Sequence, residues 1–162
     1  LVSNHLKMLC MIIINKDSSE DKFVQIHNIS EIKENNSIFF DLDFWKNNKK
    51  DLIKKNCDLG IKISSDEPIN EIVENLEIFK LINFNFLSFK DGRPFSYARK
   101  IRENLKYENK IRASGNILPD QYIFLLRCGF DSFEIKKNQI KTWENILKNN
   151  FESYYQFTES ST

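Results

Sequence analysis

The apolar and polar positions of this 162-residue chain fall into short strand-like runs and longer helical periods. Two apolar runs at 11–14 and 22–26 flank a polar turn, a pattern typical of two strands joined by a loop. From residue 37 onward, β-branched or aromatic runs alternate with segments whose apolar residues lie three and four positions apart. The runs cover residues 38–40, 60–64, 81–87, 110–114 and 132–135, and the helical segments cover about 43–55, 69–78, 96–106, 118–128 and 138–149.

This alternation predicts βα units, and therefore an α/β fold with a small, mainly parallel sheet and right-handed crossovers. Five such units fit a doubly wound sheet or an incomplete barrel, and the pattern does not choose between them. The N-terminal pair of runs predicts a short antiparallel hairpin. We expect a single domain over residues 11–156, because a chain of this length buries a sizeable core as one unit. Residues 1–10 are predicted to be a ragged leader and residues 157–162 a disordered tail.

Composition narrows the class of protein. With 41% hydrophobic and 29% charged residues, the chain resembles a soluble globular protein rather than a disordered one. The apolar run from Met8 to Ile14 is too short for a membrane span and lacks the charged start and cleavage site of a signal peptide. The three cysteines are widely spaced without a C-x-x-C pair, which is typical of a reducing compartment. We therefore expect a cytoplasmic protein without a membrane anchor.

Charge is distributed unevenly along the chain. The net charge is only +1, so no overall basic field favours nucleic-acid binding. Residues 90–127, however, hold nine basic and four acidic side chains, a net charge of +5 that leaves about −4 for the remainder. All the arginines lie in this segment, at Arg93, Arg99, Arg102, Arg112 and Arg127. Lysine suffices on a solvated surface, so arginine here suggests planar, bidentate binding of an oxyanion or carboxylate.

Two loops are expected to carry the function, because ligands of open parallel sheets bind outside the carboxyl ends of the strands. In the first loop, residues 90–96, Gly92 suits a positive φ and Ser96 suits a helix N-cap. The second loop, residues 115–121, opens a helix with Pro119. We expect side chains of both loops to converge on one basic cleft. The predicted ligand-binding residues are Arg93, Arg99, Arg102, Arg112, Asp120 and Gln121.

Internal pairing is the alternative for these arginines, with Asp91, Asp120 or Asp131 as partners. The chain has neither a glycine-rich nucleotide motif nor a nucleophile elbow. Its two histidines lie outside the βα region, so we expect no metal site, and proton transfer would fall to Asp91, Asp120 or Tyr97. Gly129 is predicted to end a helix in the left-handed conformation, with Cys128 buried beside it.

Several linked motifs occur in order between about residue 59 and residue 156. They are Leu-Gly-Ile at 59–61, Phe-x-Asp-Gly-Arg-x-Phe-Ser-x-Ala-Arg at 89–99, Arg-Glu at 102–103, Arg-Ala-x-Gly at 112–115, Asp-Gln at 120–121, Arg-Cys-Gly-Phe-Asp-x-Phe-Glu at 127–134 and Tyr-Gln at 155–156. Together they resemble a bacterial family of unknown function whose genes commonly neighbour those of assimilatory sulfite reductase and which is often labelled a probable oxidoreductase. At Asn116 the family usually has Asp, so a catalytic carboxylate implied there is missing from this chain.

The resemblance and the basic loops together lead to one hypothesis and a rival. The hypothesis is an accessory protein of assimilatory sulfite reduction that binds a small oxyanion, an anionic cofactor or an acidic partner. The implied partner is sulfite reductase or another enzyme of sulfur assimilation. The rival is an oxidoreductase that uses a separately supplied flavin or nicotinamide. The sequence favours the accessory protein, because redox chemistry needs a carrier and no motif in the chain binds one.

Overall fold

The structure is a computed structural model that describes residues 11–17, 19–33, 36–150 and 157–159. Its strands are β1 (Met11–Asn15), β2 (Phe23–Gln25), β3 (Ser37–Asp41), β4 (Asp58–Ser64), β5 (Phe79–Phe86), β6 (Lys110–Gly115), β7 (Ser132–Lys136) and β8 (Phe157–Glu159). The α-helices in the described ranges are α2 (Leu42–Leu52), α3 (Asn70–Val73), α4 (Arg93–Glu103), α5 (Tyr122–Arg127) and α6 (Ile140–Asn150). Short 3-10 turns are Ile29–Glu31, Leu76–Ile78, Pro119–Gln121 and Lys137–Gln139.

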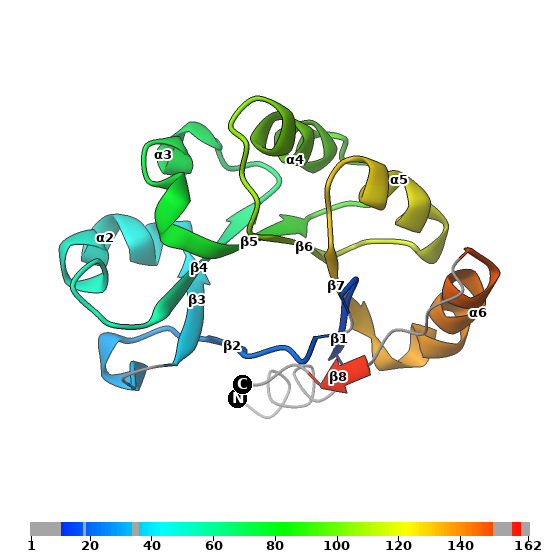
Figure 1. Ribbon diagram of the computed structural model, residues 1–162, viewed down its shortest axis with the longest axis horizontal. Helices are drawn as coiled ribbons and strands as arrows, with labels where there is room; N and C mark the ends of the chain where they lie inside the picture. The colour runs from blue at the N-terminus through cyan, green and yellow to red at the C-terminus, as the bar shows by residue number, and fades with distance from the viewer. Residues whose placement is uncertain (1–10, 18, 34–35, 151–156, 160–162) are drawn as a thin grey trace.

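The strands form one eight-stranded sheet in the order β2-β3-β4-β5-β6-β7-β1-β8. Strands β2 to β7 run parallel to one another in sequence order, whereas β1 pairs antiparallel with both β7 and β8. Figure 1 shows the sheet as an open arc with the helices along its outer side. A doubly wound sheet reverses its strand order and places helices on both faces. The fold is therefore the incomplete barrel, and the predicted α/β class is confirmed.

The predicted N-terminal hairpin is wrong, although both of its strands exist. Strand β1 pairs with β7 and β8, whereas β2 pairs in parallel with β3 at the opposite edge of the sheet. The connection between them crosses the amino ends of the parallel strands instead of turning back on itself (Figure 1). Side-chain contacts hold it there, since Ser19 accepts a hydrogen bond from Lys110 and Asp21 pairs with Arg112.

The C-terminal residues also differ from expectation. The tail predicted to be disordered from residue 157 contains β8, whose residues Phe157–Glu159 pair with Ile12–Ile14 of β1. The short length of the run, three residues, explains why its sequence alone did not indicate a strand. The predicted leader at 1–10 and the last residues, 160–162, lie outside the described residues.

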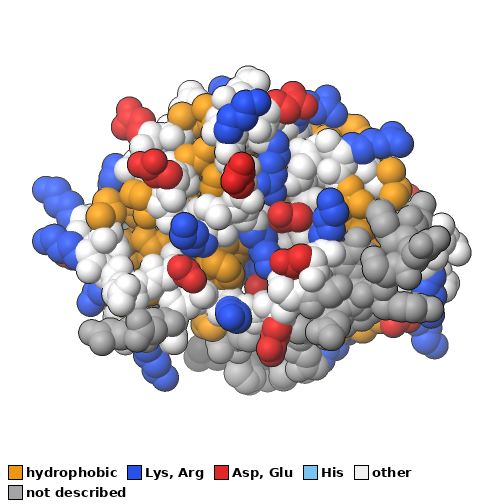
Figure 2. Space-filling view, in the orientation of Figure 1, with side chains coloured by type: hydrophobic (Ala, Val, Ile, Leu, Met, Phe, Trp, Pro, Cys, Tyr) orange, Lys and Arg blue, Asp and Glu red, His pale blue; other side chains and the backbone are white. Residues whose placement is uncertain are grey.

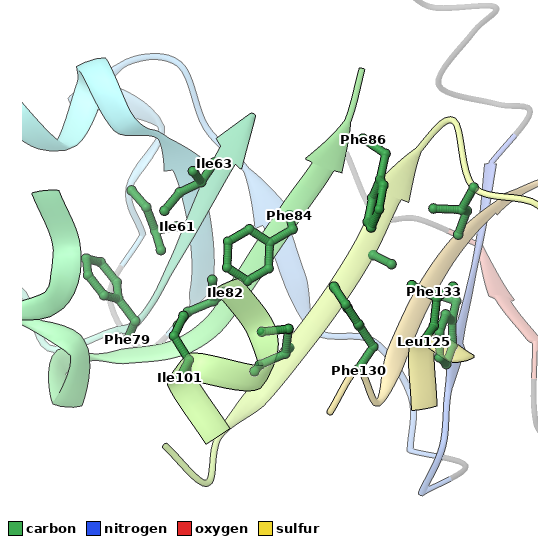
Figure 3. Close-up of a cluster of buried hydrophobic side chains, with 14 of the residues drawn as sticks. Ile61, Ile63, Phe79, Ile82, Phe84, Phe86, Ile101, Leu125, Phe130 and Phe133 are labelled. Carbon is green, nitrogen blue, oxygen red and sulfur yellow. The ribbon is translucent and has the colours of Figure 1, made fainter. Parts of the chain in front are cut away.

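The apolar core lies between the outer face of the sheet and the helices. Ile82, Phe84 and Phe86 of β5 are fully buried on this face, and Ile101 of α4 packs on them (Figure 3). Burying such a side chain stabilises the fold by about 1.5–3 kcal/mol. The core therefore fixes where the helices, and the loops that precede them, lie on the sheet.

The inner, concave face of the sheet is polar over much of its area. Side chains alternate between the two faces of a strand, so Asn83 and Asn85 point away from the core that their neighbours Ile82 and Phe84 enter. Strand pairing extends this pattern into two rows of polar positions across the sheet. One row is Asp41, Lys62, Asn83, Arg112, Ser132 and Asn15, and the other is Ser64, Asn85 and Ser114.

Candidate functional site

The first loop is organised by Asp91 rather than by the predicted glycine and serine. Helix α4 begins at Arg93, so Ser96 lies inside the helix, and Gly92 has a φ of −83°. The carboxylate of Asp91 accepts hydrogen bonds from the Arg93 backbone nitrogen at 3.1 Å and from the guanidinium at 3.0 and 2.7 Å. A side-chain cap and a proline in the first helical turn start the helix three residues earlier than its apolar spacing predicts.

The same carboxylate ties two loops together. Hydrogen bonds from Arg93, and next from the Ser65 hydroxyl, hold the pKa of Asp91 well below its usual range. Ser65 also accepts a hydrogen bond from the backbone nitrogen of Leu87 at 3.3 Å. A carboxylate that is so stabilised in its ionised form is a weak base, so these contacts favour a structural role for Asp91 over the predicted role in proton transfer.

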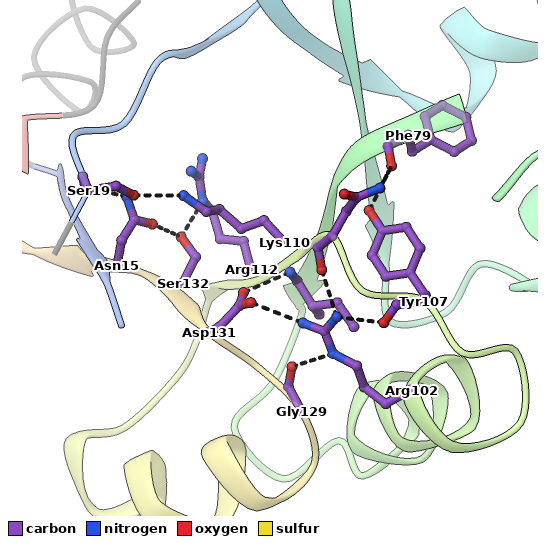
Figure 4. A network of polar contacts seen from close by, with 12 residues as sticks. Asn15, Ser19, Phe79, Arg102, Tyr107, Lys110, Arg112, Gly129, Asp131 and Ser132 are labelled. Atoms are coloured by element: carbon purple, nitrogen blue, oxygen red, sulfur yellow. Dashed lines mark hydrogen bonds and ion pairs between the residues drawn. The ribbon is translucent and has the colours of Figure 1, made fainter. Parts of the chain in front are cut away.

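Arg102 is engaged by the protein itself. Its Nε donates to the Gly129 carbonyl oxygen at 3.0 Å, and its Nη1 donates to the carbonyl oxygens of Tyr107 and Asn109, both at 2.7 Å. Its Nη2 pairs with Asp131 at 3.0 Å, and the other oxygen of that carboxylate accepts from a backbone nitrogen of β6 (Figure 4). One planar guanidinium thus connects α4, the loop before β6 and the loop before β7, which lysine could not do.

Arg112 lies on the concave face, on the other side of the sheet from Arg102. It is 1% exposed, and its guanidinium pairs with Asp21 and donates to the Ser132 hydroxyl at 3.0 Å. Ser132 in turn donates to Asn15 at 2.7 Å (Figure 4). The internal-pairing alternative therefore describes Arg93, Arg102 and Arg112, although the partner of Arg112 is an aspartate that the sequence did not single out.

The two predicted loops do meet. Gln121 donates to the carbonyl oxygen of Phe89 at 2.9 Å, and Asn116 donates to that of Leu87 at 2.8 Å. The side-chain oxygen of Gln121 also accepts from the Leu118 backbone nitrogen, which caps the 3-10 turn that holds Asp120. Asp120 is exposed on this turn. The two loops are thus in contact through amide side chains, but the four predicted arginines do not share one cleft.

Arg99 is the predicted arginine whose guanidinium faces a groove. The groove runs between α4 and α5, encloses about 400 Å³ and is lined by Gly92, Phe95, Ser96, Arg99, Lys100, Glu103, Asn104, Phe124 and Cys128. The Arg99 side chain is 50% exposed and lies 4.0 Å from Glu103. Its Nη2 contacts the Cys128 sulfur at 3.6 Å. Neither contact is a bidentate pair, so most of its five N–H donors face the groove or solvent.

The groove has one apolar wall and one basic rim. Phe95 and Phe124 stack at a centroid distance of 4.8 Å, and Phe124 remains 48% exposed. Arg99 and Lys100 each carry a positive charge, whereas Glu103 carries one negative charge. On the face shown in Figure 2, by contrast, basic and acidic side chains of the described residues are intermixed. The groove suits a ligand that carries both a negative group and an apolar part.

Several features of the site were not predicted from the sequence. Cys128 is buried as predicted, with Gly129 at a φ of +103° behind it, but its contact with Arg99 was not expected. Phe124 was assigned only to a helix. The polar rows of the concave face could have been found, because strands covered on both faces read as continuous apolar runs, whereas 60–64, 81–85 and 110–114 alternate apolar and polar residues.

Tyr97, the remaining candidate for proton transfer, packs against Phe84 at a centroid distance of 6.1 Å and is half-buried.

Within the described ranges, no group of three or more His, Cys, Asp and Glu side chains is placed to hold a metal ion. Among the helices of these described residues, none has the length and apolar character needed to cross a membrane.

Comparison with protein families gives one finding. Residues 60–162 match the model of a family described as "Bacterial protein of unknown function (DUF934)". The matched region begins in β4 and includes both loops, the α4–α5 groove and the Arg102 network. Comparison with curated proteins finds no match.

Proposed function

Because the chain belongs to this family of bacterial proteins of unknown function, we propose its role from the groove itself: it is an accessory protein that binds an acidic segment of a partner protein between α4 and α5. The partner we propose is an enzyme of assimilatory sulfite reduction in the cytoplasm, as the resemblance in the loop motifs implies. In this proposal the chain positions or stabilises its partner and performs no redox step.

The exposed guanidinium of Arg99 is the observation that carries the proposal. Arg93 is held by Asp91, Arg102 by its four hydrogen bonds and Arg112 by Asp21. Arg99 has a sulfur contact and a 4.0 Å ion pair, so N–H donors of its guanidinium are available to a carboxylate of another molecule. Arginine and exposed aromatic side chains are enriched at protein interfaces, and both line this groove.

The dimensions of the groove favour a peptide segment over a lone inorganic ion. Its lining extends from Gly92 to Asn104, the whole length of α4. That helix has 11 residues and is therefore about 16 Å long. An extended segment of about five residues spans the same distance. Such a segment would place one carboxylate at Arg99 and one apolar side chain against Phe124.

Binding of the full chain to assimilatory sulfite reductase, measured by calorimetry and by co-purification, tests the proposal. We expect Arg99→Gln and Phe124→Ser each to weaken binding about tenfold, equivalent to about 1.4 kcal/mol. Lys50→Gln removes an exposed positive charge from α2, at the other side of the arc, and should leave affinity unchanged. Equal binding by all variants would exclude the groove.

The same preparation tests the rival oxidoreductase. The full chain is titrated with flavin and nicotinamide nucleotides, and its absorbance is recorded with a reductant present. Tight, saturable binding of such a carrier with turnover would replace the accessory role by an enzymatic one. Absence of binding to the reductase in every assay would overturn the proposed partner.

A further inference from the structure

The concave face of the sheet carries a cluster of polar side chains that is separate from the α4–α5 groove. Asn83 and Ser114 are both 1% exposed, and they lie on the adjacent strands β5 and β6. The Ser114 hydroxyl contacts the Asn83 side-chain oxygen at 2.7 Å and the Asn85 side-chain oxygen at 3.5 Å. These positions belong to the carboxyl half of the two strands, where barrel proteins bind their ligands.

One polar atom of this cluster lacks a partner. Ser114 donates a hydrogen bond to the oxygen of the Asn83 amide. The Asn83 amide nitrogen is buried without a hydrogen bond to any described residue. Buried amide groups are nearly always paired, because leaving one unpaired forfeits its bonds to water. The donor therefore points to an acceptor supplied from outside the described chain.

A positive charge lies beside this donor. Lys62 is the register partner of Asn83 on β4, so both side chains leave the same face of the sheet at neighbouring positions. Ser64 and Asn85 are paired in the same way one row further toward the carboxyl ends. Lys62, Ser64 and Asn85 are half-buried, whereas Asn83 is enclosed. The enclosed Asn83 is thus bordered by a lysine in its own row and by Ser64 and Asn85 toward the carboxyl ends.

The amino side of the same face is already filled. Asp21 and Ser19, in the connection between β1 and β2, contact Arg112 and Lys110 from the concave side. Arg112 is neutralised by that pairing, so it adds no net charge to the neighbouring row. On the β4 side, the positive group nearest to Asn83 by strand register is Lys62. The next register partner in that direction is Asp41 of β3, whose carboxylate is exposed.

We infer that Lys62, Asn83 and the hydroxyl of Ser64 form a binding site for a small anion with at least two acceptor oxygens, either a carboxylate or an inorganic oxyanion, and that Ser114 orients Asn83 within it. Asn83 donates to one oxygen, and the Lys62 ammonium balances the charge. Ser114 is held by the two asparagines in the orientation that leaves the Asn83 nitrogen free. The site does not depend on the proposed partner, because it lies on the opposite face of the sheet from the groove.

Calorimetric titration of the full chain with acetate, sulfite, sulfate and phosphate tests this site and separates the two kinds of anion. We expect saturable binding of at least one of them, weakened about tenfold or more in Lys62→Gln and in Asn83→Asp, which places a negative charge where the donor was. Lys62 is half-buried rather than enclosed, so its replacement keeps the test interpretable even where Asn83→Asp folds poorly. Lys50→Gln should bind the anion as the parent chain does.

Three results would overturn the site. They are no binding of any of the four anions, equal binding by the parent and Lys62→Gln chains, and a crystal grown with the best anion that shows only water at Asn83. Loss of anion binding in Arg99→Gln would assign the anion to the groove instead. Failure of the reductase assay with intact anion binding would reject the proposed partner and leave this site standing.

Discussion

Gly129 lies against the side chain of Arg102, whose Nε donates a 3.0 Å hydrogen bond to the Gly129 carbonyl oxygen. The residue has a φ of +103°, and a Cβ added to it would overlap with the Cγ of Arg102 and approach its Nε to 3.2 Å. The backbone nitrogens of Gly129 and Phe130 bond back to Leu126 and Leu125, which ends α5 as a glycine stop. The helix stop and the arginine network therefore share one residue without a side chain.

Gly129→Ala should lower the free energy of unfolding by about 1–3 kcal/mol, because alanine at this φ is strained and its methyl group displaces Arg102. Urea denaturation with a fixed m-value measures the change. Gly92→Ala is the matched control, since Gly92 has a negative φ and a methyl group added to it would meet no atom within 4 Å. Similar losses in the two variants would contradict this account of Gly129.

Arg102→Lys should also be destabilising, by about 1.5–3 kcal/mol, although it keeps the charge. An ammonium cannot reach the carbonyl oxygens of Gly129, Tyr107 and Asn109 together with the Asp131 carboxylate. Arg99→Lys changes the same helix at an exposed position and should alter stability by less than about 0.5 kcal/mol. Thermal and urea unfolding of both variants provide the comparison. An equal effect at the two positions would mean that the Arg102 network contributes little.

We expect the stability of the Asp91→Asn chain to depend less on pH in the acidic range than the stability of the parent chain. Bonds from Arg93 and then Ser65 lower the pKa of Asp91 in the folded protein. Its ionised form therefore stabilises the fold above the unfolded pKa of about 3.9, and this contribution is lost as pH falls through the lower folded value. The parent chain should be the more stable at pH 7, and the difference should shrink below about pH 4.

Unfolding of both chains by urea between pH 7 and pH 2.5 measures this dependence. Asp120→Asn, which changes an exposed carboxylate of the next loop, serves as the control. A difference between the Asp91→Asn and parent chains that does not change with pH would show that the Arg93 bonds do not favour the ionised form.

Much of the fold was predictable because its signal is local. The apolar runs marked five parallel strands, from 38–40 to 132–135, within a few residues, since each strand supplies its own buried side chains to the core. Pairing partners were not predictable in the same way. The 11–14 run could pair either with the 22–26 run or with β7. It pairs with β7, which offers a longer strand edge.

The candidate site was predicted less well, because hydrogen-bond partners are a tertiary property. Arg93 makes the expected bidentate pair, but with Asp91 of the same chain, and Arg102 and Arg112 bond several separate acceptors within the protein. Asp21 lies 91 positions from Arg112, and no spacing rule joins residues so far apart. Arg99 was included as part of the arginine-rich segment, but its exposure beside Phe124 depends on how α4 and α5 lie together.

The pairing of β1 with β7 places a condition on synthesis. Asn15 and Ser132 lie side by side, yet 117 positions separate them. At a translation rate of about 5–20 residues per second, the first strand leaves the ribosome roughly 6–23 s before its neighbour exists. During that interval its isoleucines have no sheet to join, so the nascent chain offers chaperones an apolar edge until the opposite end of the polypeptide arrives.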